Sequence, residues 1–481
     1  MSLRLLSSNA AIYAVGNIGA RAAIFLLIPL YTHSLSVADF GLLATLQLTI
    51  QILGVLIMGG MSTTLLRFAT EYEAQGRLNA LLGTSILMIL FNALVLTVGT
   101  ILLLPWFFSQ VLHTPDVRSY VGLACGAAAA QSLSYHIMSY YRARQDAVRY
   151  MITGISTAVL LVGVTFVMVC AMKLGVSGAL IAMILANAAV FLTVLAFAVR
   201  RTGLRVSPSL IASLLRFGVP QVCSQSSEMV IGSVGVYLLS YFHGLETVAI
   251  YSLGNKLAII LMITTISPFS LAFEPYAFSS VDKPDRRALI ARSLTYLVLA
   301  AAFMSACLLV GIRILLPRIA PPQYASAFVV VLLLIPGMTF TGIYYFGQAL
   351  LNAMHRTRVV GVVSTIVAVF SLAINYVLIR KFGWQGAVLA FDVCSVLLGS
   401  ALTAAGVKHF HLTLEWKRVC VGTALLAALL LAFFAMRELP LIRFTLVCSL
   451  TMVLGVLLLL RYDFFNTDEK LLARRLAAKL C

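Results

Sequence analysis

The sequence predicts an all-α, polytopic membrane protein with 14 transmembrane helices. Of its 481 residues, 61% are hydrophobic and only 10% are charged, whereas soluble domains have about 25% charged residues. The apolar residues gather in fourteen continuous runs. Each run is long enough to cross a bilayer as a helix, which takes about 20 residues, and is about twice as long as a barrel strand.

The fourteen runs extend over nearly the whole chain. The expected spans are 9–31, 40–62, 81–104, 119–141, 149–171, 178–199, 218–241, 248–272, 293–316, 326–350, 359–379, 385–407, 419–436 and 443–461. The first run is interpreted as a retained helix, because no small-residue cleavage site follows a short apolar stretch. The residues after Arg461 are predicted to form a short amphipathic helix at the membrane surface.

Lysine and arginine in the connections predict the orientation. With the N-terminus in the cytoplasm, 24 of the 34 basic residues fall on the cytoplasmic side, 8 fall on the opposite side and two lie inside helices. Positive charge is retained on the cytoplasmic side of membranes. We therefore expect both termini to be cytoplasmic, and the same retention accounts for the net charge of +18 without nucleic-acid binding.

An internal repeat predicts two parallel six-helix halves. KLGVSGALIA at 173–182 matches KFGWQGAVLA at 381–390, and GRLNALLGTSILMIL at 76–90 resembles DRRALIARSLTYLVL at 285–299. The offset of 208 to 209 carries the third predicted helix onto the ninth, and the fifth and sixth onto the eleventh and twelfth. Parallel repeats with a cavity between them are typical of transporters. The expected organisation is an N-terminal lobe (1–205), a C-terminal lobe (206–410), two added helices (411–461) and a cytoplasmic tail (462–481).

No enzyme or metal motif is found in the sequence. It contains no HExxH, P-loop or GxSxG pattern and no metal-spaced His/Cys cluster. The eight cysteines form no CxxC pair and are interpreted as small buried hydrophobic residues. We therefore expect no catalytic residues, no bound metal and no cofactor.

Four ionisable residues lie well inside predicted helices. They are two cations, Arg21 and Lys256, and two acids, Glu228 and Asp392, with Asp392 near the outer end of its helix. A charge at the centre of a bilayer costs about 2.5 to 3.5 kcal/mol on insertion scales, so it needs a partner, water or a ligand. Either the cations pair with the acids, or the cations bind substrate and the acids carry a coupling ion.

Polar residues at helical spacing accompany these charges. Asn17 lies one turn before Arg21, and Asn255 precedes Lys256. Other polar residues at helical spacing are Gln47 and Gln51, Tyr344 and Gln348, and Gln225, which lies three residues before Glu228. Each could bind a neighbouring helix or line a wet cavity. His136 is expected to be a hydrogen-bonded helix contact.

Two stretches resemble the polysaccharide-unit flippases of the multidrug/oligosaccharidyl-lipid/polysaccharide exporter superfamily. One is SNAAIYAVGNIGARAAIFLLIPLYTHSLSVADFGLLATLQ at 8–47, and the other is RFGVPQVCSQSSEMVIGSVGVYLLSYFHGLETVAIYSLGNKLA at 216–258. The helix pattern and the repeat extend the resemblance over nearly the whole chain. One departure is the sequence SVGVYLLSYF late in the seventh helix, where many members carry an Asp-Arg pair.

The resemblance implies a substrate and partners. The substrate would be an oligosaccharide on an undecaprenyl diphosphate carrier, moved across the bacterial inner membrane for O-antigen, capsule or exopolysaccharide synthesis. In similar lipid II flippases, cations of the first and eighth helices hold the diphosphate, a role that would fall to Arg21 and Lys256. Glu228 or Asp392 could couple H⁺ or Na⁺, and a polymerase and glycosyltransferases would be partners.

Other functions stay open from the sequence. A lipid II or cation-coupled multidrug exporter would depend more on Glu228 and Asp392 than on the cations. A membrane glycosyltransferase or polymerase is disfavoured because the outward connections are only about a dozen residues long. A non-catalytic scaffold is disfavoured by the polar stripes.

Overall fold

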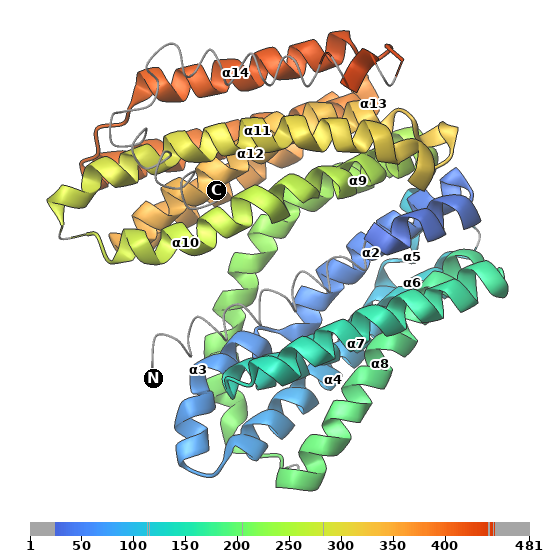
Figure 1. The fold of residues 1–481 in the computed structure, drawn as a ribbon. Helices are drawn as coiled ribbons and strands as arrows, with labels where there is room; N and C mark the ends of the chain where they lie inside the picture. Colours follow the sequence, from blue (N-terminus) through green and yellow to red (C-terminus); the bar gives the residue numbers. More distant parts are fainter. Residues whose placement is uncertain are drawn as a thin grey trace, which may run out of the picture. The chain divides into compact units, whose positions relative to one another are not determined.

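The computed structural model describes residues 25–440, apart from 113, 115, 204 and 282, together with 443–445 and 447. Side chains in these ranges are described except at 70, 198, 201, 202, 220, 223–228, 230, 231 and 284. The described part is helical throughout and contains no strand (Figure 1). The predicted all-α class is therefore confirmed.

Residues 25–34 are helical and precede α2. In chain order there follow α2 (Val37–Met58), α3 (Met61–Ala74), α4 (Leu78–Leu103), α5 (Pro105–Leu112), α6 (Val117–Ala143), α7 (Ala147–Thr165), η1 (Phe166–Ala171), α8 (Gly175–Thr202), η2 (Pro208–Leu210), α9 (Ile211–Leu261), η3 (Met262–Ile266), α10 (Ser267–Phe278), η4 (Pro284–Arg286), α11 (Arg287–Ile319), η5 (Pro322–Tyr324), α12 (Ala327–Ala353), α13 (Thr357–Phe410) and α14 (Trp416–Ala435).

Nine helical stretches within the described residues are long and apolar enough to cross a membrane. Two of them, Gly232–Phe278 and Thr357–Phe410, have 47 and 54 residues, more than twice the ~20 that one crossing needs. Each of the two turns at a glycine of positive φ, 78° at Gly244 and 58° at Gly383. Each of the two is therefore long enough for the two crossings that the sequence predicts there.

Every predicted run from 40–62 to 419–436 coincides with a helix. The runs 9–31 and 443–461 lie largely outside the described residues, so the total of fourteen stays a prediction. The sequence did not predict α3 and α5, nor the continuation of the eighth predicted helix to Phe278. α3 has too many polar residues and α5, with eight residues, is too short to form an apolar run of membrane-spanning length.

The described residues fall into two compact units. The first comprises residues of Met1–Leu253, Ile319–Tyr324 and Ser371–Ala387, and the second those of Gly254–Arg318, Ala325–Phe370 and Val388–Cys481. The lobe boundaries expected from the repeat remain a prediction.

In the first unit, α6 is the central helix. It contacts α2, α3, α4, α7 and α8. Ala124, Ala127 and Ala128 are fully buried in these contacts, and such small side chains let helix backbones approach closely. Because α6 faces other helices on most sides, it is less apolar than its neighbours and is not among the nine apolar spans.

In the second unit, α10 packs against α12. The ring of Phe273 stacks on Phe346 with centroids 4.9 Å apart, and Phe269 stacks on Phe273 at 5.2 Å. These apolar contacts belong to a core that also includes residues of α11 and α14.

The internal repeat recurs in the backbone of two tight turns. Gly175 begins α8 with φ 59°, and its repeat partner Gly383 turns α13 with φ 58°. Three residues on, a Cβ at Gly178 would lie 3.0 Å from the carbonyl oxygen of Met168, and one at Gly386 would collide with the carbonyl of Leu378. The shared KxGxxG sequence thus forms a turn in which a second glycine lets the two helix backbones touch.

A second pair of turns agrees with the repeat. Gln145 after α6 and His355 after α12 both have φ 56°. In each turn the backbone N–H of the following residue donates a hydrogen bond to a carbonyl of the preceding helix. The nitrogen of Asp146 lies 3.0 Å from the Tyr141 oxygen, and that of Arg356 lies 2.8 Å from the Leu351 oxygen. Equivalent helices in the two halves of the sequence therefore end in the same way.

Candidate functional site

Lys256 lies in the C-terminal half of α9, one residue after Asn255. Both side chains are partly buried. The neighbours Leu253, Leu257 and Ala258 are buried and apolar. Lys256 lies in the stretch Gly232–Phe278, which is long and apolar enough to cross a membrane, and its role stays a prediction.

Tyr344 and Gln348 lie one turn apart on α12, as their spacing predicts. The amide Nε2 of Gln348 donates to the hydroxyl of Tyr344 at 2.8 Å. The Tyr344 ring is buried and lies 5.0 Å from the ring of Tyr345, tilted by 55°. The two predicted polar residues therefore act as one pre-ordered pair, with the phenol held by packing against Leu351 and Leu402.

Asp392 accepts a hydrogen bond from a second helix. Its Oδ1 lies 2.9 Å from the backbone nitrogen of Gly337 on α12. Gly337 follows Pro336, which lacks an N–H and disrupts the helical hydrogen bonds around it. A Cβ at position 337 would collide with Asp392 Oδ1, so glycine there makes room for the carboxylate. Asp392 thus links α13 to the proline site of α12.

Gln47 and Gln51 lie on α2 in the first unit. Gln47 is partly buried and Gln51 is exposed. Between them, the hydroxyl of Thr49 is 2.9 Å from that of Tyr237 on α9. The sequence carries no signal for this link, because a single threonine and a single tyrosine are ordinary residues in apolar helices.

His136 is the polar centre of α6. It is fully buried, with Nε2 2.7 Å from the Ser85 hydroxyl of α4 and Nδ1 3.5 Å from the Ser62 hydroxyl of α3. The prediction of a hydrogen-bonded helix contact is confirmed. Its ring nitrogens are engaged within the first unit, which explains a buried histidine without a ligand.

The remaining predicted site residues are only partly described. Asn17 and Arg21 lie outside the described residues. Gln225 and Glu228 lie on α9, where the backbone is described and their side chains are not. Among the described candidates, the structure brings together Tyr344 with Gln348. Gln47 and Gln51 belong to the first unit, and the other described candidates belong to the second.

Three solved structures share the fold. The lipid II flippase MurJ in an inward closed conformation matches with a TM-score of 0.70 at 13% identity, over 95% of this chain and 100% of that chain. An inward-facing MATE family multidrug resistance transporter of the MOP superfamily matches with a TM-score of 0.61 at 15% identity, over 85% and 95%. A MOP superfamily transporter from Pyrococcus furiosus gives 0.58 at 14% identity, also over 85% and 95%.

The sequence itself identifies the family. No curated protein matches the chain in sequence. Residues 6–281 match the family described as polysaccharide biosynthesis protein. Since this match covers more than half of the 481 residues, and since the fold is that of the multi-pass transporters above, the chain is a multi-pass membrane protein that belongs to the polysaccharide biosynthesis protein family.

Proposed function

We propose that this protein is a flippase that moves undecaprenyl-diphosphate-linked oligosaccharide units across the bacterial inner membrane. The units would be used to build a surface polysaccharide such as O-antigen, capsule or exopolysaccharide. The observation that carries the proposal is the family match over residues 6–281. The fold shared with a lipid II flippase and the cation Lys256 inside an apolar helix support it.

The diphosphate is the part of this substrate that needs protein charge. Arg21 and Lys256 are proposed to bind it, because Arg offers paired donors to phosphate oxygens and Lys a mobile point charge. The amides Asn17, Asn255, Gln47, Gln51, Gln225 and Gln348 are proposed to hydrogen-bond the sugars, with Tyr344 as an aromatic surface. Tyr344 and Gln348 already hold each other in place, which reduces the ordering cost of binding.

Glu228 and Asp392 are proposed to couple H⁺ or Na⁺. The hydrogen bond from Gly337 to Asp392 suggests how coupling could reach a second helix. Loss of the negative charge would weaken a charge-assisted bond beside the proline of α12. The equilibrium between two arrangements of α12 and α13 would then respond to the ion.

The proposed topology places both termini in the cytoplasm, with lobes at 1–205 and 206–410, two further helices at 411–461 and a cytoplasmic tail at 462–481. Substrate would be supplied by glycosyltransferases on the cytoplasmic side and consumed by a polymerase outside. Transport would proceed by one lobe moving against the other, the mode typical of repeat-built transporters.

A deletion strain tests the proposal. It is complemented with wild type, Arg21→Ala, Lys256→Ala and Glu228→Gln, with Lys283→Ala in the exposed connection before α11 as a matched control. Membrane insertion is checked for each. We expect the deletion strain to lose polymer and to accumulate lipid-linked units on the cytoplasmic side. Arg21→Ala or Lys256→Ala proteins that insert normally and restore full polymer would contradict the assigned role of that cation.

A cation-coupled exporter is the second candidate, favoured by the fold shared with MATE transporters. In that case the deletion strain keeps its polymer and becomes sensitive to cationic drugs. Glu228→Gln and Asp392→Asn would then impair export more than the cation variants do.

A further inference from the structure

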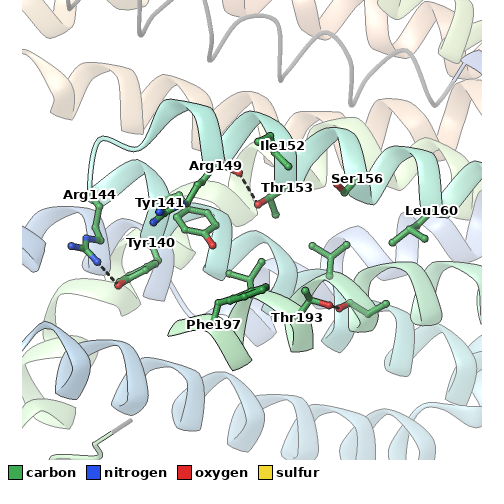
Figure 2. A pocket seen from close by; sticks show the side chains of 13 residues that line it. Tyr140, Tyr141, Arg144, Arg149, Ile152, Thr153, Ser156, Leu160, Thr193 and Phe197 are labelled. Carbon is green, nitrogen blue, oxygen red and sulfur yellow. Dashed lines mark hydrogen bonds between the residues drawn. The ribbon is translucent and has the colours of Figure 1, made fainter. Parts of the chain in front are cut away.

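A groove between α7 and α8 is lined by none of the candidate site residues whose side chains the structure describes. Its volume is 480 Å³, and its lining comes from the end of α6, from α7 and from α8 (Figure 2). One end carries two arginines, Arg144 after α6 and Arg149 in the first turn of α7. The rest of the groove is lined by apolar and small residues.

The mouth of the groove holds fixed positive charge. Arg144 donates from Nη1 to the hydroxyl of Tyr140 at 3.1 Å, as Figure 2 shows, and its guanidinium lies 5.8 Å from the ring centre of Tyr140. The hydrogen bond to Tyr140, with smaller contributions from nearby acids, raises the pKa of Arg144 above its ordinary value. The buried Tyr140 therefore orients a permanent cation toward the groove.

The acidic partners of Arg144 and Arg149 leave both guanidinium groups able to bind a ligand. Arg144 Nε is 3.7 Å from Glu73, and Arg149 Nη1 is 3.2 Å from Asp146. All four side chains are substantially exposed, and exposed ion pairs are weak. Each pair uses few of the five N–H groups of its arginine, so a phosphate can bind to the remaining donors.

Behind the mouth, the walls along α7 are mostly apolar, with Ser156 as an exposed polar exception. The hydroxyls of Thr153 and Thr193 donate to carbonyls of their own helices, at 2.7 Å each, and so offer no donor to the groove. Ala189 leaves the space open, and Leu160 and Phe197 form exposed apolar edges.

The length of the groove matches one leaflet of a bilayer. From Arg149 to Leu160 is eleven residues, or about 16 Å of helix, which is half of the ~30 Å hydrocarbon core. A basic mouth between transmembrane helices at one membrane face is a typical binding site for an anionic lipid head group. A single channel between two helices accommodates one chain, whereas a diacyl lipid would leave its second chain outside.

We propose that the groove between α7 and α8 binds a single-chain lipid with a diphosphate head group, with the head at Arg144 and Arg149 and the chain along Thr153, Ala189 and Thr193. The proposal rests on the proposed function, which makes such a lipid the carrier of the substrate. The groove would hold the carrier in the cytoplasmic leaflet.

The test is native mass spectrometry of the purified full-length protein with added undecaprenyl diphosphate. The head-group variant is Arg144→Gln/Arg149→Gln, with Arg142→Gln, an exposed arginine of the same turn outside the groove, as its control. The chain variant is Ala189→Leu, with Ala196→Leu, an exposed alanine of α8 outside the groove, as its control.

We expect the double arginine variant to bind the lipid roughly thirtyfold more weakly and both controls to bind within about twofold of wild type. Ala189→Leu should also weaken binding, while inorganic diphosphate alone should bind poorly, because the chain contributes most of the contact. Monodisperse elution of each variant shows that it is folded.

Two other outcomes would overturn the proposal. If phosphatidylglycerol binds the wild-type groove more tightly than undecaprenyl diphosphate does, the occupant is a bulk phospholipid. If undecaprenyl diphosphate binds wild type and all four variants equally, the carrier is bound elsewhere and the proposed function stands without the groove. Absence of carrier binding to wild type would count against the proposed function itself.

Discussion

Next to Pro336 of α12, a carboxylate of α13 accepts a backbone hydrogen bond. The carboxylate of Asp392 accepts a hydrogen bond from the backbone N–H of Gly337, which follows Pro336. The carboxylate that is proposed to carry a coupling ion therefore also stabilises the junction of α12 with α13. A substitution that removes both roles at once cannot distinguish them. Asparagine keeps an oxygen acceptor and removes the charge, whereas leucine removes both.

We therefore expect Asp392→Asn and Asp392→Leu to differ. Asp392→Leu should lower the free energy of unfolding by roughly 1–3 kcal/mol, because the Gly337 amide is left without its acceptor. Asp392→Asn should unfold near the wild-type temperature in detergent and should lose any stimulation of transport by an ion gradient. Equal stability of all three proteins would show that the bond contributes nothing to the junction.

Gly337 provides a second prediction at this scale. A methyl group there would meet Asp392 Oδ1 and would lie 2.7 Å from the ring of Phe391, so Gly337→Ala should destabilise the protein by roughly 1–3 kcal/mol. Gly311→Ala is the matched control, since a Cβ at Gly311 of α11 meets nothing within 4 Å. Thermal unfolding in detergent compares the two. If both variants were destabilised equally, the cause would be the replacement of a helix glycine in general and not the contact with Asp392 and Phe391.

The glycine turns of the repeat are the elements that most directly connect sequence to structure. Gly175 and Gly383 have φ of 59° and 58°, and Gly383 also has ψ of −132°, and such sparsely populated positive-φ conformations cost a residue with a side chain about 1–3 kcal/mol. We expect Gly175→Ala and Gly383→Ala each to lower thermal stability by that amount. Gly163→Ala in α7, where a Cβ meets nothing within 4 Å, should be neutral or slightly stabilising. Unchanged stability of both turn variants would mean that the two turns can adopt another backbone conformation at no cost in free energy.

Much of the element order could be predicted from the sequence, and the reason is physical. A bilayer requires continuous apolar runs, so each described run gave the position of a helix within a few residues. The polar α3 and the eight-residue α5 do not contain such a run. Helical spacing placed Tyr344 and Gln348 together because they are on one helix. The partner of Asp392 could not be predicted, because Gly337 lies 55 residues away on another helix.

For the whole molecule, the distribution of arginine and lysine predicts which face is cytoplasmic. Reporter fusions at two turns check this. A fusion in the turn at Gln145 should be fluorescent as a GFP fusion and inactive as an alkaline phosphatase fusion, and a fusion at Lys173 should show the reverse. The two turns flank α7 and η1, so one crossing separates them. Fusions that report the same side at both turns would contradict α7 as a membrane span.

The proposed transport of a diphosphate would move negative charge across the membrane, so the membrane potential would be a driving force. Outward movement runs with a potential that is negative inside, worth roughly 2.3 kcal/mol per charge per 100 mV. In proteoliposomes with labelled undecaprenyl diphosphate, we expect a potassium-valinomycin potential, negative on the side that corresponds to the cytoplasm, to accelerate translocation, and the reversed potential to slow it. If Glu228 or Asp392 also couples an ion, the rate will in addition follow the ion gradient. Glu228→Gln or Asp392→Asn will then remove the dependence on the ion gradient, while the response to potential remains. A rate that responds to neither would show that the protein equilibrates the carrier passively, with direction set by consumption of the polymer precursor outside.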